Sequence, residues 1–327
     1  MMQVPITIIT PSYNQAEYVE QTIDSVLSQN YTNLEYMIID GGSTDQSVEI
    51  FKKYEKHLSY WVSEPDQGQS HAINKGLKHA QGDVINWLNS DDFLEPGALK
   101  LIGETFENPK VKVLCGKSRK FSGREAFISK GTEIYPQSIA KTIGWARIDQ
   151  PETWFRRSAV EIVGSVNQHL HYLMDREWWI RYLLHFGISG ILQIPDILVN
   201  FRLHDKSKTI SMEEAFEIDH DTIFHGIAKA FEETEIANFI KKNSTISEYY
   251  KFPKRADQLI SESVFDYYFL RKADRAYFFQ DPFKSRTFLH QVDTLNLDTA
   301  ALKLYQKLKW RTSKLIHPVI SILKNGF

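Results

Sequence analysis

The sequence predicts an α/β fold in which helices cover both faces of a mainly parallel sheet, followed by a helical C-terminal region. Strand-type and helix-type segments alternate from Val4 to Leu88 with short connections, and each strand-type segment ends in polar, turn-forming residues. From Met212 onward, apolar residues recur almost throughout at helical spacing. Alternation of this kind is typical of a parallel sheet with right-handed crossovers, so we expect every strand-to-helix loop to lie on one edge.

Composition and spacing indicate the first two strands and the helix between them. The β-branched run Val4–Thr10 predicts a buried strand, which the turn-forming residues 11–14 close. Leu34–Asp40 predicts the second strand, and the Gly- and Ser-containing residues 41–45 end it. The intervening helix is predicted by apolar residues at helical spacing, which are Val19, Ile23, Val26 and Leu27.

The next segments continue the alternation and end in two acids. Leu58–Glu64 predicts a third strand, Gln69–Ala80 a helix and Val84–Leu88 a fourth strand. Asp91 and Asp92 follow this fourth strand, so they are expected at the sheet edge where α/β proteins bind ligands. Two acids after a strand usually form a turn and a helix N-cap. Four polar loops on one edge, with helix N-termini that favour negative charge, instead indicate a nucleotide cleft.

Composition and missing motifs exclude several classes of protein. The formal net charge of -2 gives no bulk attraction to nucleic acid, so we expect no nucleic-acid partner. Neither a Gly-x-Gly-x-x-Gly after the first strand nor a P-loop motif occurs, which disfavours a Rossmann dehydrogenase or a P-loop NTPase. The single cysteine, Cys115, suits a reducing compartment and is expected to be a small buried residue. With no signal-peptide pattern and no apolar run approaching about 20 residues, we expect a cytoplasmic protein that meets membranes only at their surface.

Six segments together resemble glycosyltransferase family 2, the inverting enzymes with the GT-A fold. The segments are Thr10-Pro11-Ser12-Tyr13-Asn14, Ser25-Val26-Leu27-Ser28-Gln29, Asp40-Gly41-Gly42-Ser43-Thr44-Asp45, Ser63-Glu64-Pro65-Asp66-Gln67-Gly68-Gln69, Ala72-Ile73-Asn74-Lys75-Gly76 and Leu88-Asn89-Ser90-Asp91-Asp92. They cover roughly the first third of the chain densely. The resemblance implies a GT-A catalytic domain over residues 1–210, with a nucleotide-binding half (1–110) and an acceptor-binding half (111–210), before a helical region at 211–327.

The resemblance also implies roles for residues near the nucleotide. Thr10, Pro11 and Tyr13 would line the nucleoside pocket, and Asp40 would contact the uracil or another base. Each of these residues stands in a position that matches a family motif.

Beside the ribose or the donor sugar, the resemblance implies roles for Asn74 and Asn89, and it makes Asp91 the metal-binding member of the family's Asp-x-Asp element. Two positions depart from the family pattern, because Asn89 stands where many relatives carry the first Asp and His71 stands where an Asp is common. His71 is then a donor-sugar contact or a solvated helix residue. Mn²⁺ or Mg²⁺ commonly takes only one or two carboxylates alongside substrate phosphates, so one carboxylate is compatible with a metal.

Inverting transfer requires a carboxylate that takes the proton of the acceptor hydroxyl. The segment Tyr172–Arg181 resembles the family's acid-containing helix start, and there Asp175 aligns with the general base and Glu177 with the following acid. Asp175 is also a good helix N-cap, and the two roles are compatible. Upstream, Gln150 and Trp154 are candidates for side chains that face the acceptor.

A second late segment, Asn200–Thr209, resembles the family's aromatic-Arg-x-His-x-x-Ser element. In that element the histidine closes over the metal and the diphosphate, which assigns His204 to the metal and Arg202 to the donor. A lone histidine is usually structural, but neighbouring cations suit a diphosphate. His204 also offers a ligand in place of the one lost at Asn89.

The remaining regions are less specific. Residues 111–135 predict added strands and a mobile flap over the acceptor site, and the apolar stripes after Met212 predict core or subunit contacts, which leaves a homo-oligomer open. The tail after Asp298 contains no acid. Its basic, amphipathic character fits either contact with an anionic inner membrane surface or a terminal helix packed on the domain.

These observations predict a metal-dependent inverting glycosyltransferase of the hexosyl or N-acetylhexosaminyl type. It would move a sugar from a nucleoside diphosphate, most simply UDP, to a hydroxyl of a glycan or lipid-linked acceptor in polysaccharide biosynthesis. A non-catalytic nucleotide-sugar-binding protein is an alternative, motivated by Asn89 and His71. A nucleotidyltransferase is less favoured, because no Gly-rich, Arg- or Lys-containing loop follows the first strand.

Overall fold

The computed structural model describes residues 3–204, 213–255, 258 and 260–313. The strands are β1 (Ile6–Ser12), β2 (Leu34–Asp40), β3 (Tyr60–Ser63), β4 (Val84–Trp87), β5 (Phe93–Leu94), β6 (Val113–Ser122), β7 (Glu125–Ile128), β8 (Thr153–Arg156) and β9 (Ile191–Arg202). The helices up to β9 are α1 (Val19–Leu27), α2 (Ser47–Tyr54), η1 (Glu55–His57), α3 (Gln69–His79), α4 (Ala98–Phe106), α5 (Ile139–Gly144), η2 (Gln150–Glu152), α6 (Arg157–Val163) and α7 (Met174–Phe186). Those after β9 are α9 (Glu213–Ala230), α10 (Thr234–Asn243), α11 (Ser263–Phe278), α12 (Pro282–Leu289), η3 (Thr294–Asn296) and α13 (Thr299–Arg311).

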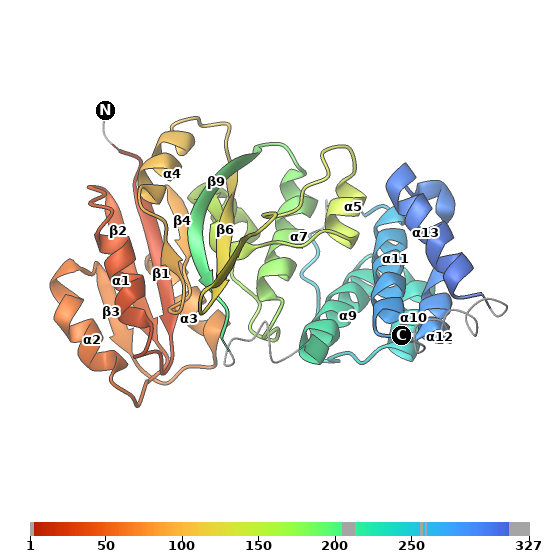
Figure 1. The fold of residues 1–327 in the computed structure, drawn as a ribbon, viewed down its shortest axis with the longest axis horizontal. Coiled ribbons are helices and arrows are strands. Elements are labelled where there is room, and N and C mark those ends of the chain that lie inside the picture. The colour runs from red at the N-terminus through yellow and green to blue at the C-terminus, as the bar shows by residue number, and fades with distance from the viewer. Residues whose placement is uncertain (1–2, 205–212, 256–257, 259, 314–327) are drawn as a thin grey trace. The chain divides into compact units, whose positions relative to one another are not determined.

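The described strands form one sheet in the order β3-β2-β1-β4-β8-β6-β9-β5, and β7 pairs with β6 (Figure 1). Strands β3, β2, β1 and β4 run parallel, whereas β8 is antiparallel to both of its neighbours, β4 and β6. Beyond β8, β6 and β9 are parallel and β5 is antiparallel to β9. The predicted α/β fold with a parallel nucleotide-side sheet is confirmed.

Helices cover both faces of the parallel strands. On one face, Ile6 and Ile8 of β1 belong to a core shared with apolar side chains of α1, α2 and α4. On the other face, where Ile9 points because side chains alternate along a strand, α3 approaches closely through Gly76. A Cβ at Gly76 would lie 2.5 Å from an Ile9 methyl carbon, so this contact requires glycine.

The predicted bounds need one correction. Strand β1 was expected to end at Thr10 with a turn from Pro11, but it continues through Pro11 and Ser12. The reason is that these residues keep the parallel register with β2, in which Pro11 stands opposite Ile39 and Ser12 opposite Asp40. Both first loops therefore begin at the same level of the sheet.

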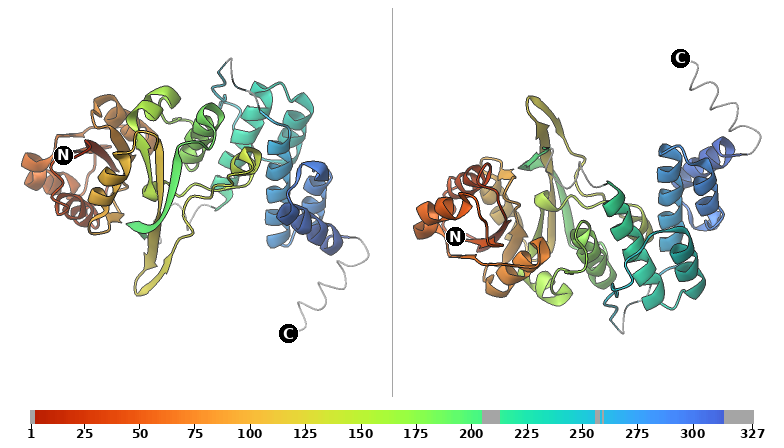
Figure 2. Two further views of the ribbon diagram at one scale, coloured as in Figure 1. Left: turned by 90° about the horizontal axis from the view of Figure 1, so that it is seen from above. Right: turned by 90° about the horizontal axis from the view of Figure 1, so that it is seen from below.

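Added strands in the second half of the chain form as predicted. Strands β6 and β7 make a hairpin, and every residue of β7 is exposed. Figure 2 shows this hairpin extending beyond the rest of the sheet. Its predicted role as a mobile flap over the acceptor stays a prediction. Cys115, in β6, is buried, as expected.

The chain divides into two compact units, which are described separately. The first comprises residues 1–133, 148–223 and 245–250 and contains the sheet; the second comprises residues 134–147, 224–244 and 251–327. The sequence-based boundary at residue 210 differs from this division and stays a prediction. None of the helices in the described part of the chain combines the length and apolarity needed to cross a bilayer.

The second unit is built around α11. Its side chains Val264, Phe265, Tyr268 and Phe269 are buried, and Ile227 of α9 is buried as well, so the core assignment of these apolar stripes is confirmed. Helix α13 is capped by Asp298 and buries Ala301 and Leu308. The tail up to residue 311 is thus a packed helix, whereas its predicted apolar and basic residues from Lys314 onward lie outside the described residues.

Candidate active site

The strand order reverses at the carboxyl ends of β1 and β4. From β1 the chain first builds outward to β2 and β3, and it then returns to add β4 on the other side of β1. Open α/β sheets bind their ligands at such a reversal point. The loops that follow β1 and β4 begin at this point and hold Tyr13, Asn89 and Asp91, and Asp40 ends β2 beside them.

The loops after β1 and β2 are joined by hydrogen bonds. The side-chain oxygen of Asn14 accepts a hydrogen bond from the Thr44 amide at 2.8 Å, and the Asn14 amide donates to the Ser43 hydroxyl at 2.7 Å. The Ala16 amide donates to the Asp45 carboxylate at 3.0 Å. These bonds fix the loops relative to each other before any ligand binds.

Of the three residues assigned to the nucleoside pocket, only Tyr13 presents an open surface. Thr10 and Pro11 are buried in β1, and the Thr10 hydroxyl lies 3.2 Å from the hydroxyl of Tyr36. The Tyr13 side chain is 60% exposed at the start of the loop. An aromatic ring in this position can stack on a planar base.

Asp40 organises the loop that follows β2. It is fully buried, and its two carboxylate oxygens accept hydrogen bonds from the Gly42 and Ser43 amides and from the hydroxyls of Ser43 and Ser63. A carboxylate has about four acceptor positions, so these bonds use its capacity. The predicted contact between Asp40 and the base stays a prediction, and it would require one of these bonds to be exchanged.

Asp91 and His204 lie side by side, although 113 residues separate them in the sequence. The distance from Asp91 Oδ2 to His204 Nε2 is 3.1 Å, and both side chains are partly accessible. The His204 ring lies 4.9 Å from the ring of Tyr18. The structure therefore brings together the two residues that the sequence assigned to the metal.

Arg202 ties the end of β9 to the acidic loop. Its Nε donates to the Asp91 carbonyl oxygen at 3.1 Å, and its backbone amide donates to the Asp92 carboxylate at 3.0 Å. The guanidinium carbon lies 4.8 Å from the ring centre of Tyr18 and 4.9 Å from that of Phe121. Arg202 thus has a structural role beside its predicted role towards the donor.

Asp92 is the buried member of the acid pair. Burial, together with the neighbouring Asp91 carboxylate, raises the pKa of Asp92 well above its usual range. Asn89 donates to Asp92 at 3.3 Å and accepts from the Gln69 side chain at 2.8 Å. Asn89 therefore lies next to the acid pair, on the side of α3.

The metal assignment can be tested against this geometry. Two adjacent ligands of an octahedral ion at about 2.1 Å are about 3 Å apart, which matches the separation of the Asp91 and His204 atoms. Nowhere in the described ranges do three or more His, Cys, Asp or Glu side chains gather into a group that could hold a metal ion by themselves. The pair fits an ion that takes its other ligands from water and from a bound diphosphate.

Asp175 lies in the first turn of α7. Leu173 occupies the N-cap position, so the prediction that Asp175 caps this helix is wrong by two residues. The Arg176 amide donates to the Asp175 carboxylate at 2.7 Å. Burial raises the pKa of Asp175 to about 6, and the charge of Asp149 acts in the same direction while Arg176 opposes it. This pKa is suited to a group that accepts protons near neutral pH.

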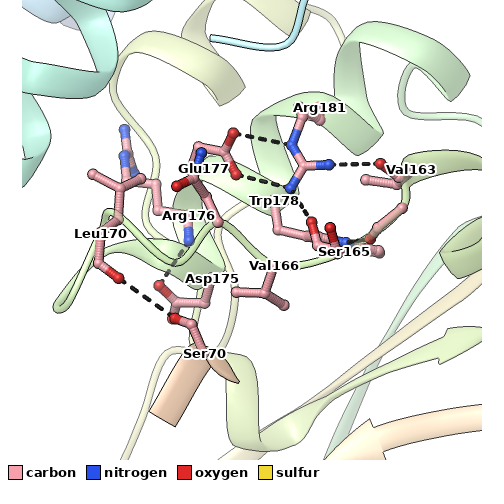
Figure 3. A network of polar contacts seen from close by, with 12 residues as sticks. Ser70, Val163, Ser165, Val166, Leu170, Asp175, Arg176, Glu177, Trp178 and Arg181 are labelled. Carbon is pink, nitrogen blue, oxygen red and sulfur yellow. Dashed lines mark hydrogen bonds and ion pairs between the residues drawn. The ribbon is translucent and has the colours of Figure 1, made fainter. Parts of the chain in front are cut away.

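A network of buried polar contacts holds the segment before Asp175 (Figure 3). Glu177 pairs with Arg181 through both carboxylate oxygens, at 3.0 and 2.9 Å. Arg181 in turn donates to the carbonyl oxygens of Val163 and Ser165, and Trp178 donates to Gly164. Glu177 is completely buried, so it orients the helix.

Asn74 anchors the same segment from α3. Its amide group donates to the Val166 carbonyl and accepts from the Val166 amide, both at 2.8 Å. Since the side chain is buried and both its groups are engaged, Asn74 positions the loop that leads to Asp175. A position beside the ribose stays a prediction. His71 accepts a hydrogen bond from the Gln67 amide at 3.1 Å within the first turn of α3.

Two acceptor-side candidates were misplaced, and their neighbours were missed. Gln150 and Trp154 are buried, and Gln150 bonds to the Trp87 carbonyl, so the prediction that they face the acceptor is wrong. Asp149 is the partly accessible residue here; it lies 3.3 Å from Lys120, and its charge acts on Asp175. Nearby Glu152 is fully buried, and burial and Asp149 raise its pKa to about 8. The spacing of Asp149 and Glu152, two acids three positions apart, could have marked them in the sequence as candidate site residues.

Comparison with known proteins adds independent evidence. The family model described as glycosyl transferase family 2 matches residues 7–181. An uncharacterized glycosyltransferase of Nostoc sp. is 34% identical over 64% of this chain and 68% of its own length. One from Rickettsia typhi is 25% identical over 75% of this chain and 82% of its own length.

Solved structures show the same fold at low sequence identity. Staphylococcus aureus TarS 1–349 in complex with UDP-GlcNAc has a TM-score of 0.56 and 18% identity, over 94% of this chain and 86% of that one. The mannosyltransferase PcManGT of Pyrobaculum calidifontis, in complex with GDP-Man and Mn²⁺, has a TM-score of 0.54 and 16% identity, over 98% and 84%.

Proposed function

Because this chain belongs to glycosyltransferase family 2, we propose that it transfers a sugar with inversion from a nucleoside diphosphate, in the first instance UDP, to a hydroxyl of a glycan or lipid-linked acceptor. The observation that carries the proposal is the combination of two features in the first compact unit. Asp91, after β4, and His204, after β9, lie in contact, and Asp175, with a pKa of about 6, lies in the first turn of α7. The pair of Asp91 and His204 suits a diphosphate with its metal, and Asp175 suits an acceptor hydroxyl.

The donor site we propose lies at the edge of the sheet, among the loops after β1, β2 and β4. The exposed Tyr13 ring would cover the base, with Thr10 and Pro11 beneath it, and Asp40 would shape the loop at 41–45 and contact the base. Asn89 would lie beside the donor sugar, and Asn74 would support that side from α3. A complex of TarS with UDP-GlcNAc supports a UDP-sugar of the N-acetylhexosaminyl type as the first donor to test.

Asp91 and His204 are the residues that would hold Mn²⁺ or Mg²⁺. The ion would neutralise the charge that develops on the leaving diphosphate. Arg202 lies against the same loop and adds a permanent positive charge. The complex of PcManGT with Mn²⁺ supports Mn²⁺ as the first ion to test.

Asp175 is proposed as the general base. The acceptor oxygen attacks the anomeric carbon from the face opposite the diphosphate while Asp175 takes the hydroxyl proton, and the bond from carbon to the diphosphate oxygen breaks. Glu177, Arg181 and Asn74 would keep the carboxylate in place. Positioning of this kind accounts for a large part of catalysis in a transfer reaction.

Titration calorimetry of UDP, with and without Mn²⁺, tests the donor half of the proposal. We expect Mn²⁺-dependent binding in the wild type and its loss in Asp91→Ala, since that substitution removes the carboxylate ligand. Binding that is equal in both proteins would refute the metal assignment. Exposed Asp83→Asn, next to the other end of β4, is a control that should bind as the wild type does.

Transfer assays on Asp175→Asn test the other half. Loss of the base should lower kcat by about 10²–10⁴-fold. UDP affinity should stay unchanged, because Asp175 does not belong to the donor site. Retained transfer would remove Asp175 from the mechanism.

Two wider proposals concern the whole chain. We propose a catalytic region at 1–210 that acts at the cytoplasmic face of a membrane in polysaccharide biosynthesis, with the basic C-terminal segment in contact with lipid. In the described part of that segment, Trp310 is 57% exposed beside Lys309 and Arg311. Aromatic and basic side chains together favour an anionic membrane surface.

A further inference from the structure

Helix α9 contributes an acid to the backbone that leads into α7. Asp219 is 7% exposed, and its Oδ2 accepts hydrogen bonds from three consecutive amides, those of His171 at 3.1 Å, Tyr172 at 2.8 Å and Leu173 at 3.1 Å. All four residues belong to the first compact unit. No family motif marks Asp219, and no pattern in the sequence singles it out.

The contact is chemically strong for two reasons. Hydrogen bonds to an ionised carboxylate are roughly twice as strong as those between neutral groups. The three amides also precede the N-terminus of α7, where the helix dipole favours a negative charge. Around the contact, the ring of Tyr172 lies 5.3 Å from that of Phe216, one helical turn before Asp219, which fixes the register of α9 on this segment.

The contact lies close to the proposed base. Leu173 is the N-cap of α7, and Asp175 follows two residues later, in the first turn. The earlier part of the same segment is held at Val166 by Asn74 and at Val163 and Ser165 by Arg181. Asp219 therefore anchors the other end of a segment whose position sets that of the Asp175 carboxylate.

We propose that Asp219 is a positioning residue for Asp175, an inference that rests on the proposed role of Asp175 as general base. Asp219 does not touch the substrate, but it fixes the backbone from which the carboxylate extends. A displacement of about 1 Å can cost about 10²-fold in rate. Loss of the anchor should thus lower kcat and leave donor binding unchanged, since the proposed donor site is built from other loops.

The kinetic test compares Asp219→Ala, Asp219→Asn and the control Glu214→Gln, an exposed acid on the same helix. UDP release from UDP-N-acetylglucosamine with an acceptor glycan measures kcat and the donor KM, and calorimetry measures UDP affinity. We expect a fall in kcat of about 10–100-fold for Asp219→Ala, a smaller fall for Asp219→Asn, which keeps one acceptor oxygen, and none for the control. The donor KM and UDP affinity should stay within about twofold of the wild type. Unchanged kcat in Asp219→Ala, or an equal loss of UDP binding, would overturn the positioning role.

Amide hydrogen exchange separates this inference from the proposed function, because it needs no substrate. In Asp219→Asn the amides of residues 171–173 should exchange faster, while those of the loops at 41–45 and 88–92 should not change. Unchanged exchange at residues 171–173 would refute the anchor whatever the activity. If the wild type transferred no sugar, or Asp175→Asn remained fully active, the proposed function would fail while the exchange result still decided on the anchor.

Discussion

A general base must be ionised before it accepts a proton, and its surroundings decide at which pH this occurs. Asp175 is partly buried, and burial raises its pKa to about 6, with the negative charge of Asp149 adding to the effect. Asp149 itself lies 3.3 Å from Lys120. Asp175 thus stays mostly ionised at neutral pH while holding more affinity for a proton than an exposed aspartate.

We predict that kcat rises with pH through about 6 and falls about tenfold per pH unit well below that value, since only ionised Asp175 is active. Asp149→Asn should move this rise in kcat to lower pH, because removing a nearby negative charge makes Asp175 easier to ionise. Lys120, no longer paired with Asp149, acts in the same direction. The measurement is a kcat–pH profile from pH 4.5 to 8 for both proteins, roughly spanning the ordinary carboxylate-to-imidazole range. A rise that moved to higher pH or stayed in place would contradict the electrostatic account.

At the level of single residues, the sequence predicted a contact between two side chains only where family motifs contained both of them. The contact of Asp91 with His204 spans 113 positions and followed from the resemblance alone. Asn74 shows the opposite case: its motif was recognised, but its pairing with Val166, 92 positions away, depends on where α3 meets the chain in space. A side chain that bonds to backbone places no demand on the residue type of its partner, so no sequence pattern reveals the pair.

At the level of elements, helix α7 is unusual because it buries a pair of oppositely charged side chains. Its buried residues include Glu177 and Arg181, one helical turn apart, whose charges are paired and almost completely shielded from water. Tyr250 approaches the same carboxylate at 3.3 Å. A pair of this kind stabilises little when intact, but an isolated partner is costly, because its charge is then buried without compensation.

We predict that Glu177→Gln lowers the free energy of unfolding by about 3–5 kcal/mol, because it leaves Arg181 without its counter-ion. Glu161→Gln is the matched control, since Glu161 and Arg157 form an ion pair at the same spacing on the surface of α6. That variant should lose less than about 1 kcal/mol. Urea unfolding of the three proteins, followed by circular dichroism, measures the difference. Equal losses in the two variants would show that burial of the pair has no consequence.

Elements with strong local signals were predicted best. The bounds of β2, Leu34–Asp40, were predicted without error, because its central residues, 36–39, are apolar and buried and the Gly- and Ser-containing residues 41–45 end it. The burial of Gln150 and Trp154, in the 3-10 turn η2 and strand β8, was harder to predict. Strand β8 lies between β4 and β6, and these neighbours decide which of its side chains are covered. Local propensity cannot report which neighbour covers a side chain.

For the molecule as a whole, the packing of α13 changes how the membrane proposal must be tested. A chain that ended at Asp298 would lack the buried Ala301 and Leu308 and the helix that Asp298 caps. It would also disturb the contact of Asp298 with Lys141, at 2.7 Å, and with Tyr267. Any loss of vesicle binding would then mix unfolding of the second unit with loss of lipid contact.

A chain that ends at Ser313 avoids this difficulty, because it keeps α13 and removes only residues 314–327, which contain Lys314 and Lys324 among apolar residues and no acid. We predict that the full chain sediments with vesicles containing anionic lipid, that the shortened chain sediments less, and that neither sediments with neutral vesicles, since each basic residue near an anionic surface adds about 1 kcal/mol. Both proteins should bind UDP equally, which controls for folding of the catalytic unit. Equal sedimentation of the two chains would refute residues 314–327 as the membrane contact.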